Sequence, residues 1–177
     1  MIDYSGKGVV ELAIYNTVRT KVMKNILQEV PDFNLAISDV VPAVWMDELS
    51  AEPHAIPGVV DEIRGAGPHI TICLVRVNGY YAEAERTFFT SRPGLEVKEL
   101  YEIMLNARDV IFDELREGVL PSDLDRRARE VLGKVGSKAR ILHRSGHGIG
   151  LTVHEEPYLS IGYNKPLKAV SYTHLTL

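Results

Sequence analysis

Three histidines lie within twelve residues in the stretch 143–157, which reads HRSGHGIGLTVHEEP and also holds three glycines. Histidine transfers protons near neutral pH and is a common metal ligand. His143 and His147 have helical spacing, but the glycines that flank His147 disfavour a helix, so the stretch does not match a helical zinc motif. Strand alternation would place His147 and His154 on opposite faces, and both serve one site only if the glycines kink the chain. From these residues alone, a packing role and a chemical role for the three histidines are about equally favoured.

A β-hairpin is predicted upstream of this stretch. An apolar, β-branched run over 70–77 ends at Asn78-Gly79, the pair that a two-residue type I′ turn requires, and a returning strand over 80–90 follows. The short turn fixes the register of the two strands. We therefore expect Ile72 to lie opposite Glu85.

Two carboxylates, Glu83 and Glu85, share one face of the returning strand with Tyr81. Such a pair can share a cation, bind a guanidinium group, or split the roles of acid and base. The alternative is an exposed hairpin with cross-strand ion pairs, in which Arg76 is the partner of Glu83. Spacing alone slightly favours this structural interpretation. His54, in the loop between Pro53 and Pro57, is by itself most simply a solvated loop residue.

The elements that must position these residues form an α+β pattern. Apolar residues recur every fourth position before Pro31, which cannot continue a helix. Ser122 is the expected N-cap of a later helix. The predicted elements are helices over 8–30, 97–116 and 122–132 and strands over 40–46, 70–77, 80–90 and 149–154.

Composition indicates a soluble globular chain that forms one domain or part of one. The 177 residues carry a formal charge of −4, with 45% hydrophobic and 25% charged residues. This excludes disordered, fibrous and disulfide-stapled classes, and the single cysteine, Cys73, cannot form an internal disulfide. A mildly acidic chain has no reason to bind nucleic acid. We see neither an apolar run that could cross a membrane nor a signal-peptide pattern, so the expected compartment is the cytoplasm.

Three segments together resemble the pita-bread family of methionine aminopeptidase, Xaa-Pro aminopeptidase, prolidase and creatinase. They are GHGIGLTVHEEP over 146–157, GYYAEAERT over 79–87 and HAIP over 54–57. The resemblance implies an α+β fold of the pita-bread type, with an antiparallel sheet and helices packed on one face. It also implies that the chain is C-terminally incomplete, a single partial catalytic domain over 1–169. Residues 170–177, VSYTHLTL, resemble a translated sequencing adapter, and a short β-strand is the alternative.

In the peptidases of this family, two aspartates, one histidine and two glutamates hold two divalent metal ions, such as Mn, Co or Zn, which activate a water molecule. By resemblance, His147 is the histidine ligand and Glu83 stands at the second aspartate. The first aspartate falls on Ile72, or on Cys73 if the register slips, and neither supplies a hard oxygen ligand. The two glutamates would follow Lys168. This chain alone is therefore not expected to hold a dinuclear centre, and we expect it to be inactive alone.

The same resemblance assigns His154 as a catalytic histidine and His54 as a catalytic and substrate-binding residue. In the creatinase branch, which works without metal, a histidine acts as acid and base and glutamates bind a guanidinium-like group. Glu85 matches one such glutamate, with Tyr81 beside it in the substrate-binding set, and the apolar Ile72 opposite it should raise the pKa of Glu85. All of these roles require His54, Glu85, His147 and His154 to meet in one pocket.

Three functions follow from the resemblance. The first is a hydrolase of the aminopeptidase type that cleaves an N-terminal or Xaa-Pro peptide bond. The second is a metal-independent hydrolase that cleaves a C–N bond of a guanidino or amide substrate. The third is a non-catalytic domain that binds peptides. The family further suggests a homodimer.

Overall fold

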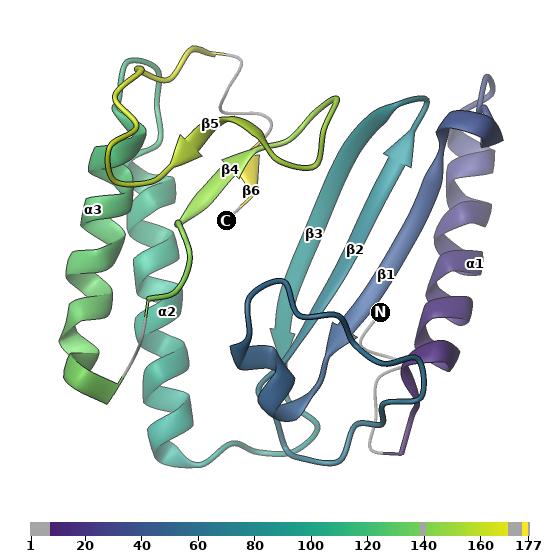
Figure 1. Cartoon of the computed structure of the whole chain (residues 1–177), viewed down its shortest axis with the longest axis horizontal. Helices are drawn as coiled ribbons and strands as arrows, with labels where there is room; N and C mark the ends of the chain where they lie inside the picture. Colours follow the sequence, from purple (N-terminus) through teal and green to yellow (C-terminus); the bar gives the residue numbers. More distant parts are fainter. Residues whose placement is uncertain (1–7, 139–140, 170–174, 177) are drawn as a thin grey trace. The chain divides into compact units, whose positions relative to one another are not determined.

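The computed structural model describes residues 8–138, 141–169 and 175–176, and it divides the chain into two compact units. Unit 1 is Met1–Pro93 and unit 2 is Gly94–Leu177. Each unit is described by itself below, and Figure 1 labels the elements of both. Whether they form a single catalytic domain over 1–169 stays a prediction.

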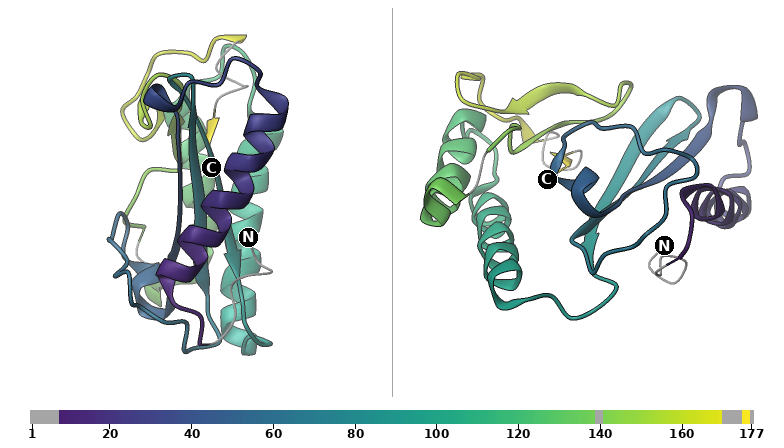
Figure 2. Two further views of the ribbon diagram at one scale, coloured as in Figure 1. Left: turned by 90° about the vertical axis from the view of Figure 1, so that its right-hand side faces the viewer. Right: turned by 60° about the horizontal axis from the view of Figure 1, so that its bottom comes forward.

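Unit 1 is an antiparallel sheet with one long helix against it. The strands β1 (Asp39–Trp45), β2 (His69–Val77) and β3 (Tyr80–Phe88) pair in the order β1-β2-β3. The helix α1 (Glu11–Glu29) packs along β1, as Figure 2 shows, and the short 3₁₀ helices η2 (Leu35–Ile37) and η3 (Asp47–Ala51) flank β1 in the sequence. The core between helix and sheet consists of Ile14, Val18, Val44, Met46, Ile63 and Phe88.

The predicted hairpin and its register are confirmed. Asn78 and Gly79 both have positive φ, 50° and 92°, as a type I′ turn requires. Ile72 pairs with Glu85, and Leu74 pairs with Glu83. A two-residue turn fixes the register of the two strands, so the sequence could predict which residues pair.

Unit 2 combines two helices with a small antiparallel sheet. The helices are α2 (Leu95–Glu114) and α3 (Pro121–Leu132), followed by the 3₁₀ helix η4 (Gly133–Lys138). The strands β4 (Gly146–Gly148), β5 (Glu155–Leu159) and β6 (Leu175–Thr176) pair in the order β5-β4-β6. The core of unit 2 consists of Ala107, Ile111, Leu115, Leu124, Ala128, Leu159 and Leu167.

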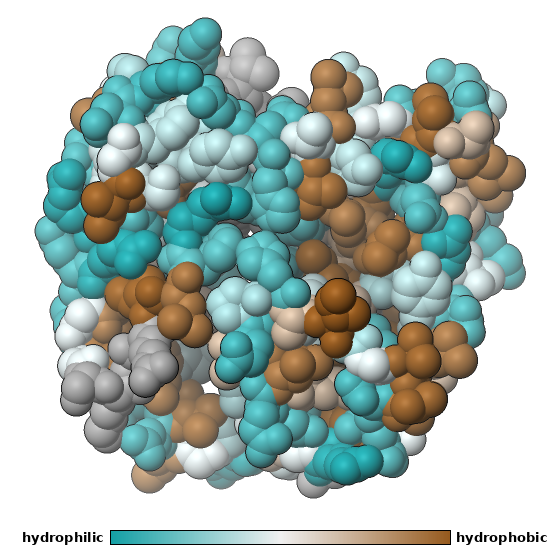
Figure 3. Space-filling model, viewed as in Figure 1, coloured by the Kyte–Doolittle hydropathy of each residue, from teal (hydrophilic) through white to brown (hydrophobic). Residues whose placement is uncertain are grey.

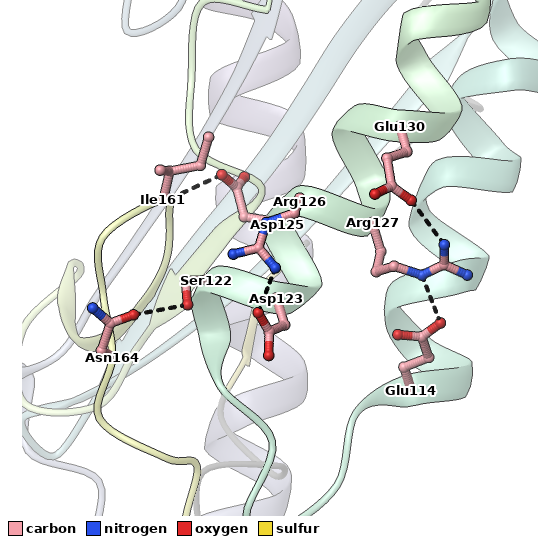
Figure 4. Close-up of polar contacts among 9 residues, drawn as sticks. All are labelled: Glu114, Ser122, Asp123, Asp125, Arg126, Arg127, Glu130, Ile161 and Asn164. Carbon is pink, nitrogen blue, oxygen red and sulfur yellow. Dashed lines mark hydrogen bonds and ion pairs between the residues drawn. The ribbon is translucent and has the colours of Figure 1, made fainter.

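Two local predictions in unit 2 are wrong. The strand expected over 149–154 is a turn between β4 and β5, in which the Glu155 carboxylate accepts a hydrogen bond from the Thr152 amide at 3.0 Å. Ser122 is not the N-cap of α3, because the helix begins one residue earlier, at Pro121, a residue whose fixed φ suits the first helical turn. The Ser122 hydroxyl instead donates to the Asn164 side chain (Figure 4).

Of the tail expected to be an adapter, Leu175 and Thr176 form β6, which pairs with β4. Residues 170–174 and 177 lie outside the described residues. Across the part of the chain that the structure describes, no helix has both the length and the apolarity to span a membrane.

Candidate functional site

The candidate residues of unit 1 lie on the sheet face that α1 does not cover. Strand alternation and the observed register put Ile72, Glu83 and Glu85 together on this face. Cys73 points to the other face, where it packs against the core under α1. A shift of register is thus excluded, and Cys73 cannot supply the ligand that Ile72 lacks. In the space-filling view, apolar and polar atoms are mixed over the sheet of unit 1 (Figure 3).

The two carboxylates hold protons more tightly than free glutamates do. Burial, with a further contribution from the charge of Glu85, raises the pKa of Glu83 to about 7. Glu85 reaches solvent at the sheet edge, yet neighbouring protein atoms desolvate its carboxylate enough to raise its pKa, as expected from the apolar Ile72 opposite. Glu83 therefore exchanges a proton near neutral pH.

The cross-strand ion pair expected between Arg76 and Glu83 does not form. The Arg76 guanidinium instead lies 5.8 Å from the centroid of the half-buried Tyr81 ring, within cation–π range. Side chains of directly paired strand residues lie closer together than those of a diagonal pair. Arg76 pairs directly with Tyr81, whereas Glu83 is diagonal to it. Glu83 is thus left without a cationic partner among the described residues, which is consistent with its raised pKa.

His54 lies close enough to Glu85 for its charge to lower the pKa of Glu85 against the effect of burial. The exposed His54 has a backbone φ of +60°, in the left-handed region that residues with a side chain rarely adopt. The charge of an imidazole thus acts on a carboxylate about thirty residues later in the sequence of unit 1. Such a pair can bind a cationic group or pass a proton to a substrate.

Unit 2 brings the other two histidines together. The rings of His147 and His154 lie 4.3 Å apart between centroids, tilted by 57°. The strand register breaks between His147 and Gly148, and a side chain at Gly148 would lie 2.6 Å from the Glu156 carbonyl oxygen. The chain kinks at this glycine, which removes the alternation that would have separated the two imidazoles.

His147 is buried and oriented by its own strand. Its Nδ1 lies 3.0 Å from the Gly148 carbonyl oxygen, which can only accept, so Nδ1 carries the hydrogen. A backbone carbonyl that holds one ring nitrogen in this way fixes the tautomer and the ring orientation, an arrangement common for functional histidines. His154 is exposed beside it and is accessible to a substrate.

A buried aspartate, which the sequence did not single out, holds this motif in place. Asp125 of α3 is fully buried, and its Oδ1 accepts from the Ser145 amide and hydroxyl at 3.1 and 2.6 Å. Its Oδ2 accepts from the Ile161 amide at 3.0 Å (Figure 4) and from Arg129 Nε at 2.8 Å. Ser145 precedes β4 and Ile161 follows β5, so one carboxylate ties both ends of the histidine segment to α3. An aspartate among the buried residues of an amphipathic helix is the signal that could have revealed it.

The residues present do not fit the two-metal ligand set that the resemblance implies. Ile72, at the position of the first aspartate, offers no donor, so Glu83 is the one strand residue of unit 1 at an expected ligand position that carries a carboxylate. Among the described residues, no group of three or more histidine, cysteine, aspartate or glutamate side chains could hold a metal ion. In unit 1 the charge of His54 lowers the pKa of Glu85, and in unit 2 the rings of His147 and His154 lie against each other. Their convergence in one pocket stays a prediction.

The model of metallopeptidase family M24 matches residues 3–175, nearly the whole chain. The chain belongs to this family. It is 39% identical to the probable dipeptidase PepE of Mycobacterium bovis over 84 residues, 48% of the chain and 22% of that protein. It is 32% identical to the Xaa-Pro dipeptidase of Pyrococcus furiosus over 112 residues, 63% of the chain and 32% of that protein.

The fold agrees with solved relatives of this M24 chain. The crystal structure of dipeptidase PepE from Mycobacterium ulcerans superposes with a TM-score of 0.73 and 27% identity, over 94% of the chain and 42% of the solved protein. The α+β fold of the pita-bread type expected from the sequence is thereby confirmed. The chain spans less than half of the length of these relatives.

Proposed function

We propose that the protein carrying this sequence is a hydrolase that cleaves the amide C–N bond at the N-terminal end of a small peptide, with Xaa-Pro dipeptides as the candidate substrates. Membership of metallopeptidase family M24 supports this function, as do relatives named as a probable dipeptidase and an Xaa-Pro dipeptidase. The observation that carries the proposal is the contact between the buried His147 and the accessible His154 within the histidine motif.

The chain's own residues supply two parts of this chemistry. The exposed His154 is placed to donate a hydrogen bond to the oxyanion that develops on the scissile carbonyl, with His147 packed against it as a fixed support. In unit 1, burial raises the pKa of Glu83 to about 7, so this carboxyl can hold a proton near neutral pH. The amine that leaves when a C–N bond breaks must be protonated, and a group with a pKa near 7 does this efficiently.

The structure gives a specific reason to keep a second candidate, a metal-independent hydrolase of a guanidino or amide C–N bond. Ile72 stands where the first metal ligand is expected, and the carboxylate of Glu85 opposite it is accompanied by His54. A carboxylate that is free of metal is suited to bind a planar guanidinium group. The third candidate, a peptide-binding domain without turnover, shares the same fold.

Hydrolysis of Xaa-Pro dipeptides and of guanidino substrates, each with and without a chelator, separates these functions. The proposed peptidase releases the N-terminal residue of Xaa-Pro dipeptides. Chelator-resistant turnover of only the guanidino substrate would establish the second candidate. Saturable peptide binding with no turnover would establish the third. A parallel titration of the whole protein that carries this sequence with Mn²⁺, Co²⁺ or Zn²⁺ measures directly whether each copy binds two ions.

The role of His154 is tested by His154→Ala, for which we expect a loss of turnover of about 100-fold or more, as for other oxyanion donors. The melting temperature should not change, because His154 is exposed. His143→Ala, at an exposed histidine of the same stretch, is the matched control and should retain turnover. Full turnover in His154→Ala would remove this residue from the mechanism.

A further inference from the structure

We propose that Glu155 is a positioning residue for His154: its carboxylate closes the turn between β4 and β5 and so holds the exposed His154 imidazole against the buried His147. This inference rests on the proposed function only for its catalytic consequence. The contacts that carry it all lie within unit 2.

The hydrogen bonds of this turn converge on Thr152. Its amide donates to Glu155 Oε2 at 3.0 Å, and its hydroxyl, 3.2 Å from the same oxygen, donates to the His154 carbonyl oxygen at 3.0 Å. Its carbonyl oxygen accepts from the Gly150 amide at 3.1 Å. The carboxylate of Glu155 and the carbonyl group of His154 are thus both tied to Thr152, which restrains the backbone around His154.

The turn depends on these polar contacts because its tip contributes little to the core. Ile149, at the start of the turn, is buried, but Leu151 and Thr152 at the tip are exposed, Leu151 by 65%. An exposed tip gains little free energy from burial of apolar surface. A side chain that accepts from a backbone amide a few residues away can fix the conformation of such a segment instead. The Glu155 carboxylate is the group that does so here.

The space beside Gly150 is a second observation that fixes the place of the carboxylate. A Cβ at Gly150 would lie 2.6 Å from Glu155 Oε1 and 3.2 Å from Glu155 Cδ. The carboxylate therefore fills the space that a side chain at residue 150 would take. The φ of Gly150 is not in the left-handed region, so its backbone also suits alanine. Gly150→Ala should push the flexible end of Glu155 away from Thr152 and leave the strands in place.

The turn also determines where the His154 ring lies. Gly148 pairs with Glu155 in the ladder of β4 and β5, so the turn begins and ends on one pair of strand residues. The two histidines each come directly before one member of this pair, and their ring centroids lie 4.3 Å apart. Without the carboxylate, the backbone of His154 could rotate and carry its exposed ring away from His147. The ring of His147 would stay, because it is buried in β4.

NMR follows the contact between the two imidazoles directly and does not need turnover. In the full chain labelled at histidine, cross-peaks from the nuclear Overhauser effect between the ring protons of His147 and His154 are measured at one fixed pH. The wild type should show them, and Glu155→Ala should lose most of their intensity. Gly150→Ala, which displaces the carboxylate without removing it, should have the same effect. Glu155→Gln, which keeps an acceptor for the amide of Thr152, should restore the cross-peaks.

Glu156→Gln is the matched control. The side chain of Glu156 is 55% exposed and pairs with Lys165 Nζ at 2.9 Å, so its replacement should leave the cross-peaks at wild-type intensity. Two results would overturn the proposal. One is wild-type cross-peaks in Glu155→Ala or, if that variant does not fold, in Gly150→Ala. The other is a loss in Glu156→Gln as large as the loss in Glu155→Ala.

Turnover of the whole protein that carries this sequence judges the proposed function separately. If it hydrolyses Xaa-Pro dipeptides, Glu155→Ala should reduce kcat by about tenfold to 100-fold, the cost of a small misplacement of a catalytic group, with a smaller effect on KM. Loss of the cross-peaks in Glu155→Ala, without hydrolysis by the wild type, would sink the proposed function and leave the role of Glu155 established. Hydrolysis by the wild type, with the cross-peaks intact in Glu155→Ala, would do the reverse.

Discussion

Glu11, at the first residue of α1, is a buried carboxylate whose protonation should govern the stability of unit 1. Burial raises its pKa from 4.5 to about 7, opposed by a hydrogen bond from the Val44 amide and supported by the nearby charge of Asp61. Its second oxygen, Oε2, is buried and has no hydrogen-bond partner in the described residues. The ionised form of Glu11 is therefore the costly one in the folded chain.

The sign of the pH dependence follows from the two pKa values. Between pH 4.5 and 7 the unfolded chain releases the proton of Glu11 while the folded chain keeps it, so the free energy of unfolding falls as pH rises and levels off above pH 7. Glu11→Gln retains an acceptor for the Val44 amide and cannot ionise. We expect it to raise the free energy of unfolding at pH 8 by about 1–3 kcal/mol, and to have little effect near pH 4.

Urea unfolding at pH 4, 6 and 8 measures this difference. Glu83 has a similar pKa, so a reduced slope with pH should remain in Glu11→Gln. Glu29→Gln, at the exposed last residue of α1, is the control and should follow the wild type at every pH. An equal stability difference between Glu11→Gln and wild type at all three pH values would show that Glu11 does not titrate in this range.

At the scale of elements, Asp125 joins α3 to both ends of the segment that carries the histidine motif. Four donors converge on its buried carboxylate, including Arg129 one helical turn later. Asp125→Asn keeps the size of the side chain but replaces one acceptor with an NH₂ group that faces donors, and it removes the negative charge that pairs with Arg129. We expect a loss of about 3 kcal/mol in the free energy of unfolding.

Asp123→Asn on the same helix provides a direct comparison. The Asp123 side chain is 47% exposed and pairs only with Arg126 across three residues in the described structure, so its loss should cost less than about 1 kcal/mol. Chemical denaturation of both variants measures the difference. NMR chemical shifts of the His147 and His154 rings should move in Asp125→Asn and stay in Asp123→Asn. A similar loss in the free energy of unfolding for the two substitutions would show that the Asp125 hydrogen bonds do not hold the histidine segment to α3.

The elements themselves were largely predictable where local rules decide them. The periodic apolar residues of α1 and the Asn78-Gly79 turn each specify one structure, and both were predicted correctly. The segment 149–154 was not, because its alternation resembles a strand while the Glu155 carboxylate stabilises a turn. The same turn brings His154 back to His147. A single side-chain contact does not recur along the sequence as the apolar residues of a helix or strand do, so no sequence pattern reveals it.

At the scale of the whole molecule, the sequence could nominate candidate site residues, which stay predictions, but not their arrangement. The motifs identified His54, Glu85, His147 and His154, and the register made Ile72 the neighbour of Glu85. The raised pKa of Glu83 depends on burial by residues distant in the sequence, and the left-handed backbone of His54 depends on its loop. The Asp125 carboxylate acts through hydrogen bonds from Ser145 and Ile161, which lie in other segments of the chain. Such contacts follow from the complete fold.

The two units also have separate hydrophobic cores, which predicts how the molecule should unfold. Ile14 of unit 1 and Leu124 of unit 2 are both fully buried, and each packs with core residues of its own unit. Replacement of either by alanine should cost about 2–5 kcal/mol. In native-state hydrogen exchange, Ile14→Ala should lower protection in α1 and β1–β3, and Leu124→Ala should lower it in α2 and α3. Because the cavities lie in different cores, each variant should leave the amides of the other unit near wild-type protection. A uniform loss of protection along the whole chain in both variants would instead mean that the two cores unfold as a single cooperative structure.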